Sequence, residues 1–382
     1  MTAPQMERLC YAATLVAVFA YSSGYAGWVL PVLLVLSLGA VLAGRRRWIP
    51  TTLDRPMVAL LAAALASGLA SEWRGESVGL ATLFAAAVLG TVFTVGLALR
   101  VGRAAVGAIA WAWIAGGLAA AVWGMARSGT WPVAASTPAV GPTGLGTTLA
   151  AAYALTLGTW TVASGWAQRG LIAFGLPVLA AALELTGSRG AWIGAAAAAV
   201  VLIAVAPRAR TALVVLCLAS VVLATLAIGH KREPLAGRLG SIPSLEANVD
   251  RWDLWRSVPK IVRDHPALGS GYGTFTRIWP RYSPDPRYGE KPTAHNVYLN
   301  FAAETGLLGL AAFLAFVGAG LGGLWRRLGQ HRGDGRTDGL WAGFFAAAVA
   351  ILTHQLFDAT VMSWHTGYGV IALFALGGSR DE

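Results

Sequence analysis

Long runs of Ala, Leu, Val and Gly alternate with short polar connections over most of this chain. A membrane-spanning helix needs about 20 mostly apolar residues. The runs therefore predict about twelve transmembrane helices, at residues 9–24, 28–44, 56–72, 78–99, 104–126, 143–165, 170–186, 190–206, 211–228, 295–324, 339–357 and 360–378. The first two are short and close together, so they could form a hairpin instead. The expected fold class is an all-α polytopic membrane protein.

One stretch breaks this pattern, because residues 229–294 are polar and rich in Arg, Trp, Pro and Tyr. It divides the chain into three parts. Residues 1–228 are expected to form a transmembrane bundle of about nine helices, residues 229–294 a long extramembrane loop, and residues 295–382 about three further transmembrane helices. This contrast favours a protein that carries out chemistry at the membrane surface.

Inside the long loop, residues 250–263 alternate apolar and charged side chains at helical spacing. Trp252, Trp255, Val258 and Val262 fall on one stripe, and Arg256, Lys260 and Arg263 lie off it. This predicts an amphipathic helix, either lying along the membrane interface or packed on top of the bundle. His265-Pro266 is expected to end the helix.

Two further segments of the loop follow the amphipathic helix. Residues 269–273 form a glycine-rich turn that could approach a phosphate closely. As a phosphate motif it is weak, because no strand–turn–helix context surrounds it. Residues 279–292 contain four prolines and predict an irregular segment long enough to act as a lid.

Charge supports the membrane interpretation. Only 12% of the residues are charged and the mean hydropathy is +0.60, whereas soluble domains carry about 25% charged residues. Arg residues fill alternate connections between the predicted spans, which places both termini in the cytoplasm. The long loop then lies on the outer side of the membrane, where membrane topology does not explain its positively charged residues. The net charge of +11 therefore indicates an anionic lipid phosphate as partner, and no nucleic acid.

Two residues are candidates for chemistry. His295 lies where the polar loop meets a new span, and an interfacial imidazole exchanges protons near neutral pH. Its alternative role is to cap or pack a helix. Arg189 lies in a very short connection between two spans on the outer side, where it breaks the charge pattern. It could clamp a phosphate bidentately or extend to the lipid headgroups.

Several other polar residues support these two. Arg238 and Arg251 open the long loop and could join Arg189 in an anion pocket. His354 and Asp358 are four residues apart near the outer end of a span, so we expect them to share a helix face. Such a pair could orient a catalytic group or hold helices together. No His, Cys, Asp or Glu cluster has metal-ligand spacing, so we expect no metal and no cofactor.

In combination these motifs resemble the O-antigen ligase and O-antigen polymerase superfamily of bacterial envelope glycosyltransferases. The matching pieces lie within about residues 186–310: Ser188-Arg189-Gly190-Ala191-Trp192, Arg238-Leu239, Arg251 with Trp255, His265 to Gly271, and His295-Asn296 with Leu299, Glu304 and Gly306. The resemblance implies a helical membrane fold of the GT-C type with a periplasmic active site, in the bacterial inner membrane.

By this resemblance His295 is the catalytic base, and Arg189, Arg238 and Arg251 hold a diphosphate, with Asn296 as a supporting residue. The donor is an undecaprenyl-diphosphate-linked glycan. A ligase passes the glycan to a sugar hydroxyl of the lipid A–core, and a polymerase to another carrier-linked unit. We favour the ligase, because a phosphorylated acceptor suits a cationic loop. A transporter of an anionic lipid fits less well, since few ionisable residues lie mid-span. The sequence does not predict the oligomeric state.

Overall fold

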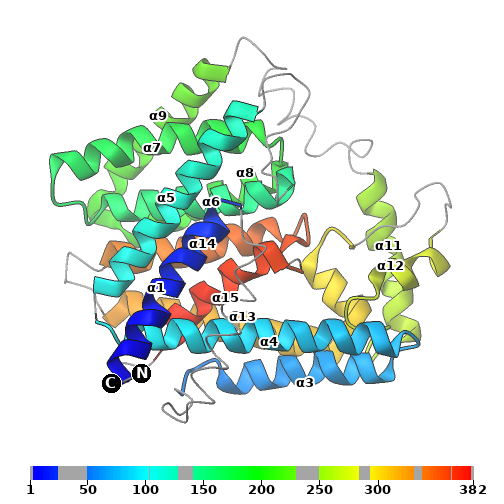
Figure 1. The fold of residues 1–382 in the computed structure, drawn as a ribbon. Helices are drawn as coiled ribbons and strands as arrows, with labels where there is room; N and C mark the ends of the chain where they lie inside the picture. The colour runs from blue at the N-terminus through cyan, green and yellow to red at the C-terminus, as the bar shows by residue number, and fades with distance from the viewer. Residues whose placement is uncertain are drawn as a thin grey trace.

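A computed structural model describes residues 3–24, 50–102, 104–127, 141–228, 249–283, 293–330, 338–362 and 364–379 (Figure 1). The first half contains α1 (Ala3–Ser22), α3 (Asp54–Ala70), α4 (Arg74–Leu99), α5 (Ala104–Arg127), α6 (Pro142–Trp160), α7 (Trp166–Leu185), α8 (Arg189–Val205), the short 3-10 helix η2 (Pro207–Ala209) and α9 (Arg210–Ile228). The second half contains α11 (Val249–Asp264), α12 (Phe275–Ile278), η4 (Trp279–Arg281), α13 (Val297–Gln330), α14 (Asp338–His354), η6 (Thr360–Met362) and α15 (Trp364–Gly378).

The predicted spans correspond closely to these helices. Residues 28–44 lie outside the described part of the chain, and each of the other predicted segments overlaps a helix. Within the described residues, five segments are long and apolar enough to cross a membrane, namely Arg74–Leu99, Ala104–Ala126, Trp166–Leu185, Pro207–Ala227 and Val297–Gln330. The structure thus supports a polytopic helical membrane protein, and the part of the chain that it describes does not bear out the number of twelve spans.

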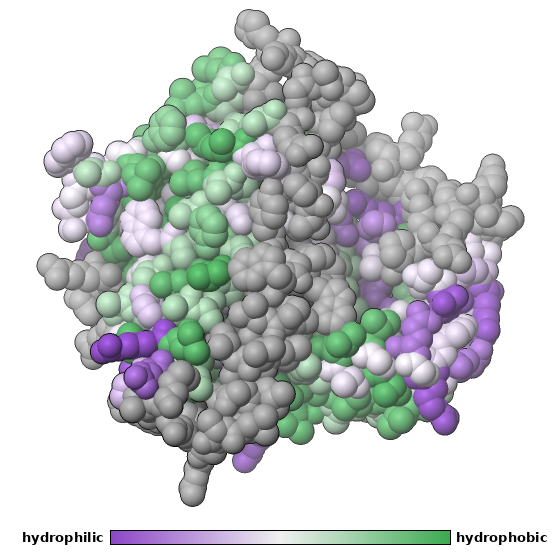
Figure 2. Space-filling view, viewed as in Figure 1, coloured by the Kyte–Doolittle hydropathy of each residue, from purple (hydrophilic) through white to green (hydrophobic). Residues whose placement is uncertain are grey.

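The outer surface of the bundle is apolar, as a lipid-facing surface must be. On α9, Leu218, Val222 and Leu226 are all more than half exposed, and Phe174 on α7 is 73% exposed. Figure 2 shows hydrophobic residues gathered over α5, α7 and α9, whereas hydrophilic residues cluster where α3 meets α4. This distribution is the reverse of that on a soluble domain.

Helix α6 lies at the centre and is buried along almost its whole length. Small residues allow its neighbours to approach closely. A Cβ atom on Gly158 would lie 2.5 Å from the Cα of Gly343 in α14, and one on Gly146 would lie 2.9 Å from the Cβ of Ala191 in α8. The three helices are thereby fixed against one another, and their common end forms part of the site described below.

Helix α13 kinks at Gly306, where φ is 66° and ψ is −170°. Above the kink, the carboxylate of Glu304 accepts hydrogen bonds from the backbone N–H groups of Gly273 and Phe275, both at 2.9 Å. A Cβ atom on Gly306 would lie 2.3 Å from the carbonyl oxygen of Ala267. The glycine-rich turn therefore encloses a carboxylate of the protein itself.

Helix α11 confirms the predicted amphipathic helix, but the predicted stripe is wrong in part. Its buried face consists of Leu254, Val258 and Ile261, whereas Trp252 is 40% exposed. The buried face packs against α12 and the start of α13 in a small hydrophobic core of its own. Of the two predicted placements, the structure shows the helix packed against protein on this face.

Candidate active site

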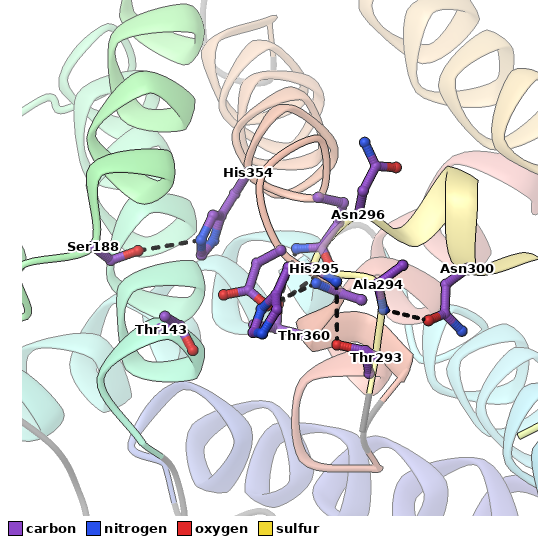
Figure 3. A network of polar contacts seen from close by, with 12 residues as sticks. Thr143, Ser188, Thr293, Ala294, His295, Asn296, Asn300, His354 and Thr360 are labelled. Atoms are coloured by element: carbon purple, nitrogen blue, oxygen red, sulfur yellow. Dashed lines mark hydrogen bonds and ion pairs between the residues drawn. The ribbon is translucent and has the colours of Figure 1, made fainter. Parts of the chain in front are cut away.

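His295 lies two residues before the start of α13 and adopts an uncommon backbone conformation, with φ at 49°. Its Nδ1 atom lies 3.3 Å from Oδ1 of Asp358, and its side chain is 34% exposed. The preceding residue is held on both sides, because Asn300 accepts a hydrogen bond from the N–H of Ala294 at 2.9 Å and the Trp255 indole donates to its carbonyl at 3.1 Å. Positive φ in a non-glycine residue is often found at functional sites. The imidazole is thus held at one nitrogen, and about a third of the side chain is exposed. Figure 3 shows His295 next to Thr293 in this polar network.

Asp358 is the buried partner of this pair. Its Oδ1 atom also accepts the backbone N–H of Ala359 at 2.8 Å, while Oδ2 is buried without a hydrogen-bond partner among the described residues. Burial raises the pKa of Asp358, but the hydrogen bond from His295 and the charges of His295 and His354 together leave it below its usual value. The group is therefore a carboxylate that holds the His295 ring in one orientation.

His354 has a different environment, although it is close in sequence to Asp358. Its ring is 1% exposed, with Thr147 Oγ1 2.8 Å from Nδ1 and Ser188 Oγ 3.2 Å from Nε2. Helix α14 ends at His354, so the expectation that His354 and Asp358 share a helix face is wrong. The intervening residues form turns, which direct the carboxylate of Asp358 toward His295. His354 joins α14 to α6 and α8, and both ring nitrogens are engaged.

Arg189 is the first residue of α8 and stands between Ser188 and Gly190, which both lie against this histidine. Its neighbours explain the local sequence, because Ser188 contacts His354 and a Cβ atom on Gly190 would lie 2.7 Å from the His354 ring. The motif therefore brings α8 against the end of α14. This close packing places the half-buried guanidinium of Arg189 at the same end of the bundle as His295.

Arg251, near the start of α11, completes the charged cluster. Burial lowers the pKa of Arg251, the negative charge of Asp358 raises it, and the positive charge of Arg189 lowers it again, with a net decrease. Asp358 and Arg189 thus lie within electrostatic range of Arg251. Two cations and one anion at a half-buried location leave an excess of positive charge, which suits an anionic ligand.

The remaining predicted residues have other positions. Asn296 caps α13, since its Oδ1 atom accepts the N–H groups of Tyr298 and Leu299, both at 3.0 Å. Its amide nitrogen donates to the Leu356 carbonyl at 2.9 Å. Asn296 is thus occupied by helix capping. Arg238 lies outside the described residues.

The structure adds polar residues that sequence reasoning missed. Thr147 Oγ1 lies 2.9 Å from Thr360 Oγ1, and the Gln355 side chain both donates to Thr360 at 2.9 Å and accepts the N–H of Val361 at 3.0 Å. These hydrogen bonds fix the turn that carries Asp358. Hydroxyl groups inside apolar helices usually bond their own backbone, so nothing in the sequence distinguishes Thr147.

Two Arg residues attach the loop to the turn between α3 and α4. Arg281 pairs with Glu72 at 2.8 Å and lies 4.9 Å from the Trp73 ring centre, and Arg277 pairs with Glu76 at 3.2 Å. These exposed ion pairs each contribute little stability. Within the described residues, no three His, Cys, Asp or Glu side chains converge as metal ligands do.

Comparison with known proteins matches one family to part of the chain. The family model described as O-antigen ligase matches residues 172–314, a segment that contains Arg189, Arg251 and His295 and ends before Asp358. A search of the curated proteins found no significant match. The matched segment includes both guanidinium groups and the imidazole of the cluster, on a bundle of apolar helices. Over residues 172–314, the chain is thus similar to the O-antigen ligase family.

Proposed function

We propose that this protein transfers a glycan from undecaprenyl diphosphate to a sugar hydroxyl of the lipid A–core, the O-antigen ligase reaction. The observation that supports this most strongly is the electrostatic coupling of Arg251 to Arg189 and to Asp358, the hydrogen-bond partner of His295. We place the site at the periplasmic face of the inner membrane, on a fold of the GT-C type. The same cluster would serve a polymerase, which differs in its acceptor.

The two guanidinium groups bind the diphosphate in this proposal. Two like charges near each other in a half-buried location repel one another, and an anion between them removes that cost. Guanidinium groups bind phosphate oxygens bidentately. As the bond from the sugar to the diphosphate breaks, negative charge grows on the departing oxygen, and preorganised cations stabilise that charge. Arg189 and Arg251 thereby lower the barrier to departure and supply charge neutralisation without a divalent cation.

His295 acts as the base. Because Asp358 accepts the hydrogen bond from Nδ1–H, the tautomer with a lone pair on Nε2 is favoured. This nitrogen takes the proton of the acceptor hydroxyl, whose oxygen forms the new bond to the anomeric carbon. The electron pair of the old bond leaves with undecaprenyl diphosphate, and attack from the opposite side inverts the anomeric configuration. A positioned base typically contributes about 10²–10⁴-fold.

Reconstitution in lipid with a defined undecaprenyl-diphosphate glycan tests the proposal. Two acceptors compete, lipid A–core and a second carrier-linked unit, and mass spectrometry identifies which one gains the glycan. We expect the lipid A–core to gain it, with chelator present throughout. Gain on the second unit alone establishes a polymerase, and a requirement for added Mg²⁺ or Mn²⁺ contradicts the metal-independent step.

The role of Arg251 has a matched control on the same helix. Arg256 is exposed on α11, whereas Arg251 is half-buried beside Arg189. Replacing Arg251 with Ala removes a charge-assisted contact of about 1.5–3 kcal/mol, so kcat/KM should fall roughly 10- to 100-fold. Arg256→Ala should change kcat/KM less than threefold. Equal effects of the two substitutions would show that the loop contributes only general positive charge.

A further inference from the structure

A polar cavity lies at the opposite end of the bundle from His295. Helix α13 begins beside the site at Val297 and, after its kink at Gly306, continues to Gln330. The roughly 20 residues between Gly306 and Arg326 rise about 30 Å, which matches the thickness of a bilayer's hydrocarbon core. A cavity of about 250 Å³ opens there, between the ends of α13 and α15 and the start of α3.

One wall of the cavity is a fixed cation. Arg327 is buried, and its Nη2 atom donates to the carbonyl oxygen of Ser379 at 2.6 Å and to the Ser379 hydroxyl at 2.9 Å. Its guanidinium also lies 5.6 Å from the Trp341 ring centre. These contacts hold the Arg327 side chain in one orientation in the wall of the cavity.

The other walls add hydrogen-bond donors. Arg326 and Gln330 are exposed at the rim. Thr52 also lines the cavity, and its Oγ1 atom is buried without a hydrogen-bond partner among the described residues. A buried hydroxyl without a partner is uncommon, and Thr52 could donate a hydrogen bond to a ligand in the cavity. The nearest acid on α3, Asp54, is already bonded to the N–H and hydroxyl of Thr51, at 3.0 and 2.6 Å.

The floor of the cavity results from close helix packing. A Cβ atom on Gly323 would lie 2.7 Å from the Gly377 carbonyl oxygen, and one on Gly377 would lie 2.6 Å from the Leu324 nitrogen. Because α13 and α15 touch here through glycines, their backbones approach closely beside the cavity. A polar ligand can therefore reach between the two helix ends.

We propose that this cavity binds a phosphate group, with Arg326 and Arg327 neutralising its charge and Thr52 and Gln330 donating hydrogen bonds. A guanidinium pair with neutral donors suits the several oxygens of a phosphate. The cavity lies at the end of helices that cross the membrane, where the headgroup of an anionic phospholipid is present at high local concentration. Free inorganic phosphate has the same chemistry, so the test separates the two sources.

The test measures lipid binding to the purified full-length protein by native mass spectrometry. Dissociation constants are compared for phosphatidylglycerol, for phosphatidylcholine and for inorganic phosphate alone. We expect phosphatidylglycerol to bind most tightly, and Arg326→Gln to weaken it about fivefold, the effect of about one cation near an anionic surface. Thr52→Val should weaken it as well, because it removes the donor and preserves the shape of the side chain.

The control separates a built site from general attraction of lipid to positive charge. Arg208, in the connection after α8, is exposed at the same end of the bundle and outside the cavity. Arg208→Gln removes the same charge, so it should leave phosphatidylglycerol binding within a factor of two. Equal losses with Arg208→Gln and Arg326→Gln would overturn the proposal, as would equal binding of the two phospholipids. Tighter binding of inorganic phosphate than of the lipid would retain the cavity as a phosphate site and overturn the headgroup as its source.

Discussion

Replacing Asp358 with Asn tests whether the buried carboxylate serves the proposed base. The amide keeps the size of the side chain and an oxygen that can accept the Nδ1–H bond from His295. It removes the negative charge that stabilises the ring once the ring has taken a proton. The substitution therefore separates charge from geometry in the pair.

The size of the effect follows from the distance between the two groups. Opposite unit charges 3.3 Å apart attract by about 5 kcal/mol at an effective dielectric constant of about 20. His295 is 34% exposed, so water and salt reduce this value substantially. A remainder of about 2 kcal/mol corresponds to a roughly 30-fold decrease in kcat.

The assay is glycan transfer by protein reconstituted in lipid, measured as initial rates over a range of pH. We expect kcat to fall about 30-fold in Asp358→Asn, with KM for the donor nearly unchanged. A purely structural role for Asp358 would lower the melting temperature and leave kcat of the folded protein unchanged. A rate within threefold of the wild type at every pH would refute the reasoning.

Three further outcomes depend on packing and protonation. Ser188→Ala leaves Nε2 of the buried His354 without its partner, which should cost about 1–3 kcal/mol of folding free energy and lower the melting temperature. Ser164→Ala, at an exposed position, should leave the melting temperature unchanged. Gly306→Ala places a side chain at a residue with positive φ and against a carbonyl oxygen, so it should lower the free energy of unfolding by at least about 2 kcal/mol. Gly318→Ala on the same helix meets no neighbouring atom within 4 Å, so it should be neutral or slightly stabilising. The pKa of Asp358 is lowered in the folded protein, so its negative charge stabilises the fold at pH values above the unfolded pKa of about 3.9. This stabilisation is lost as the pH falls through the lower pKa of the folded state. The melting temperatures of wild type and Asp358→Asn should therefore converge only below about pH 4.

The helices could be predicted from the sequence because one physical property determines them. A backbone in lipid must satisfy its own hydrogen bonds, so each apolar run in the described residues becomes a helix. The number of complete crossings was harder to predict. Helices α8 and α14 are apolar but only 17 residues long, because the chain leaves the helix at the site to form the turns that hold Asp358 and Arg189.

The pairing of His295 with Asp358 could not be predicted in the same way. The two residues are 63 positions apart, and their contact depends on where α14 ends. A helix one turn longer would have kept Asp358 on the face of His354, as helical spacing predicts. The sequence signal that favours the actual ending is weak, since residues 355–358 contain neither Gly nor Pro.

The glycine-rich turn shows how one local pattern permits two ligands. Backbone N–H groups in a turn rich in positive φ form a site for an anion, and residues 269–273 form such a site. The anion is the Glu304 carboxylate of α13, which lies about 30 residues further along the chain. Because this carboxylate already occupies the N–H groups of Gly273 and Phe275, these groups are not available to a substrate phosphate. The charge of a diphosphate must then be met by side chains, and Arg189 and Arg251 are the cations that the fold brings to His295.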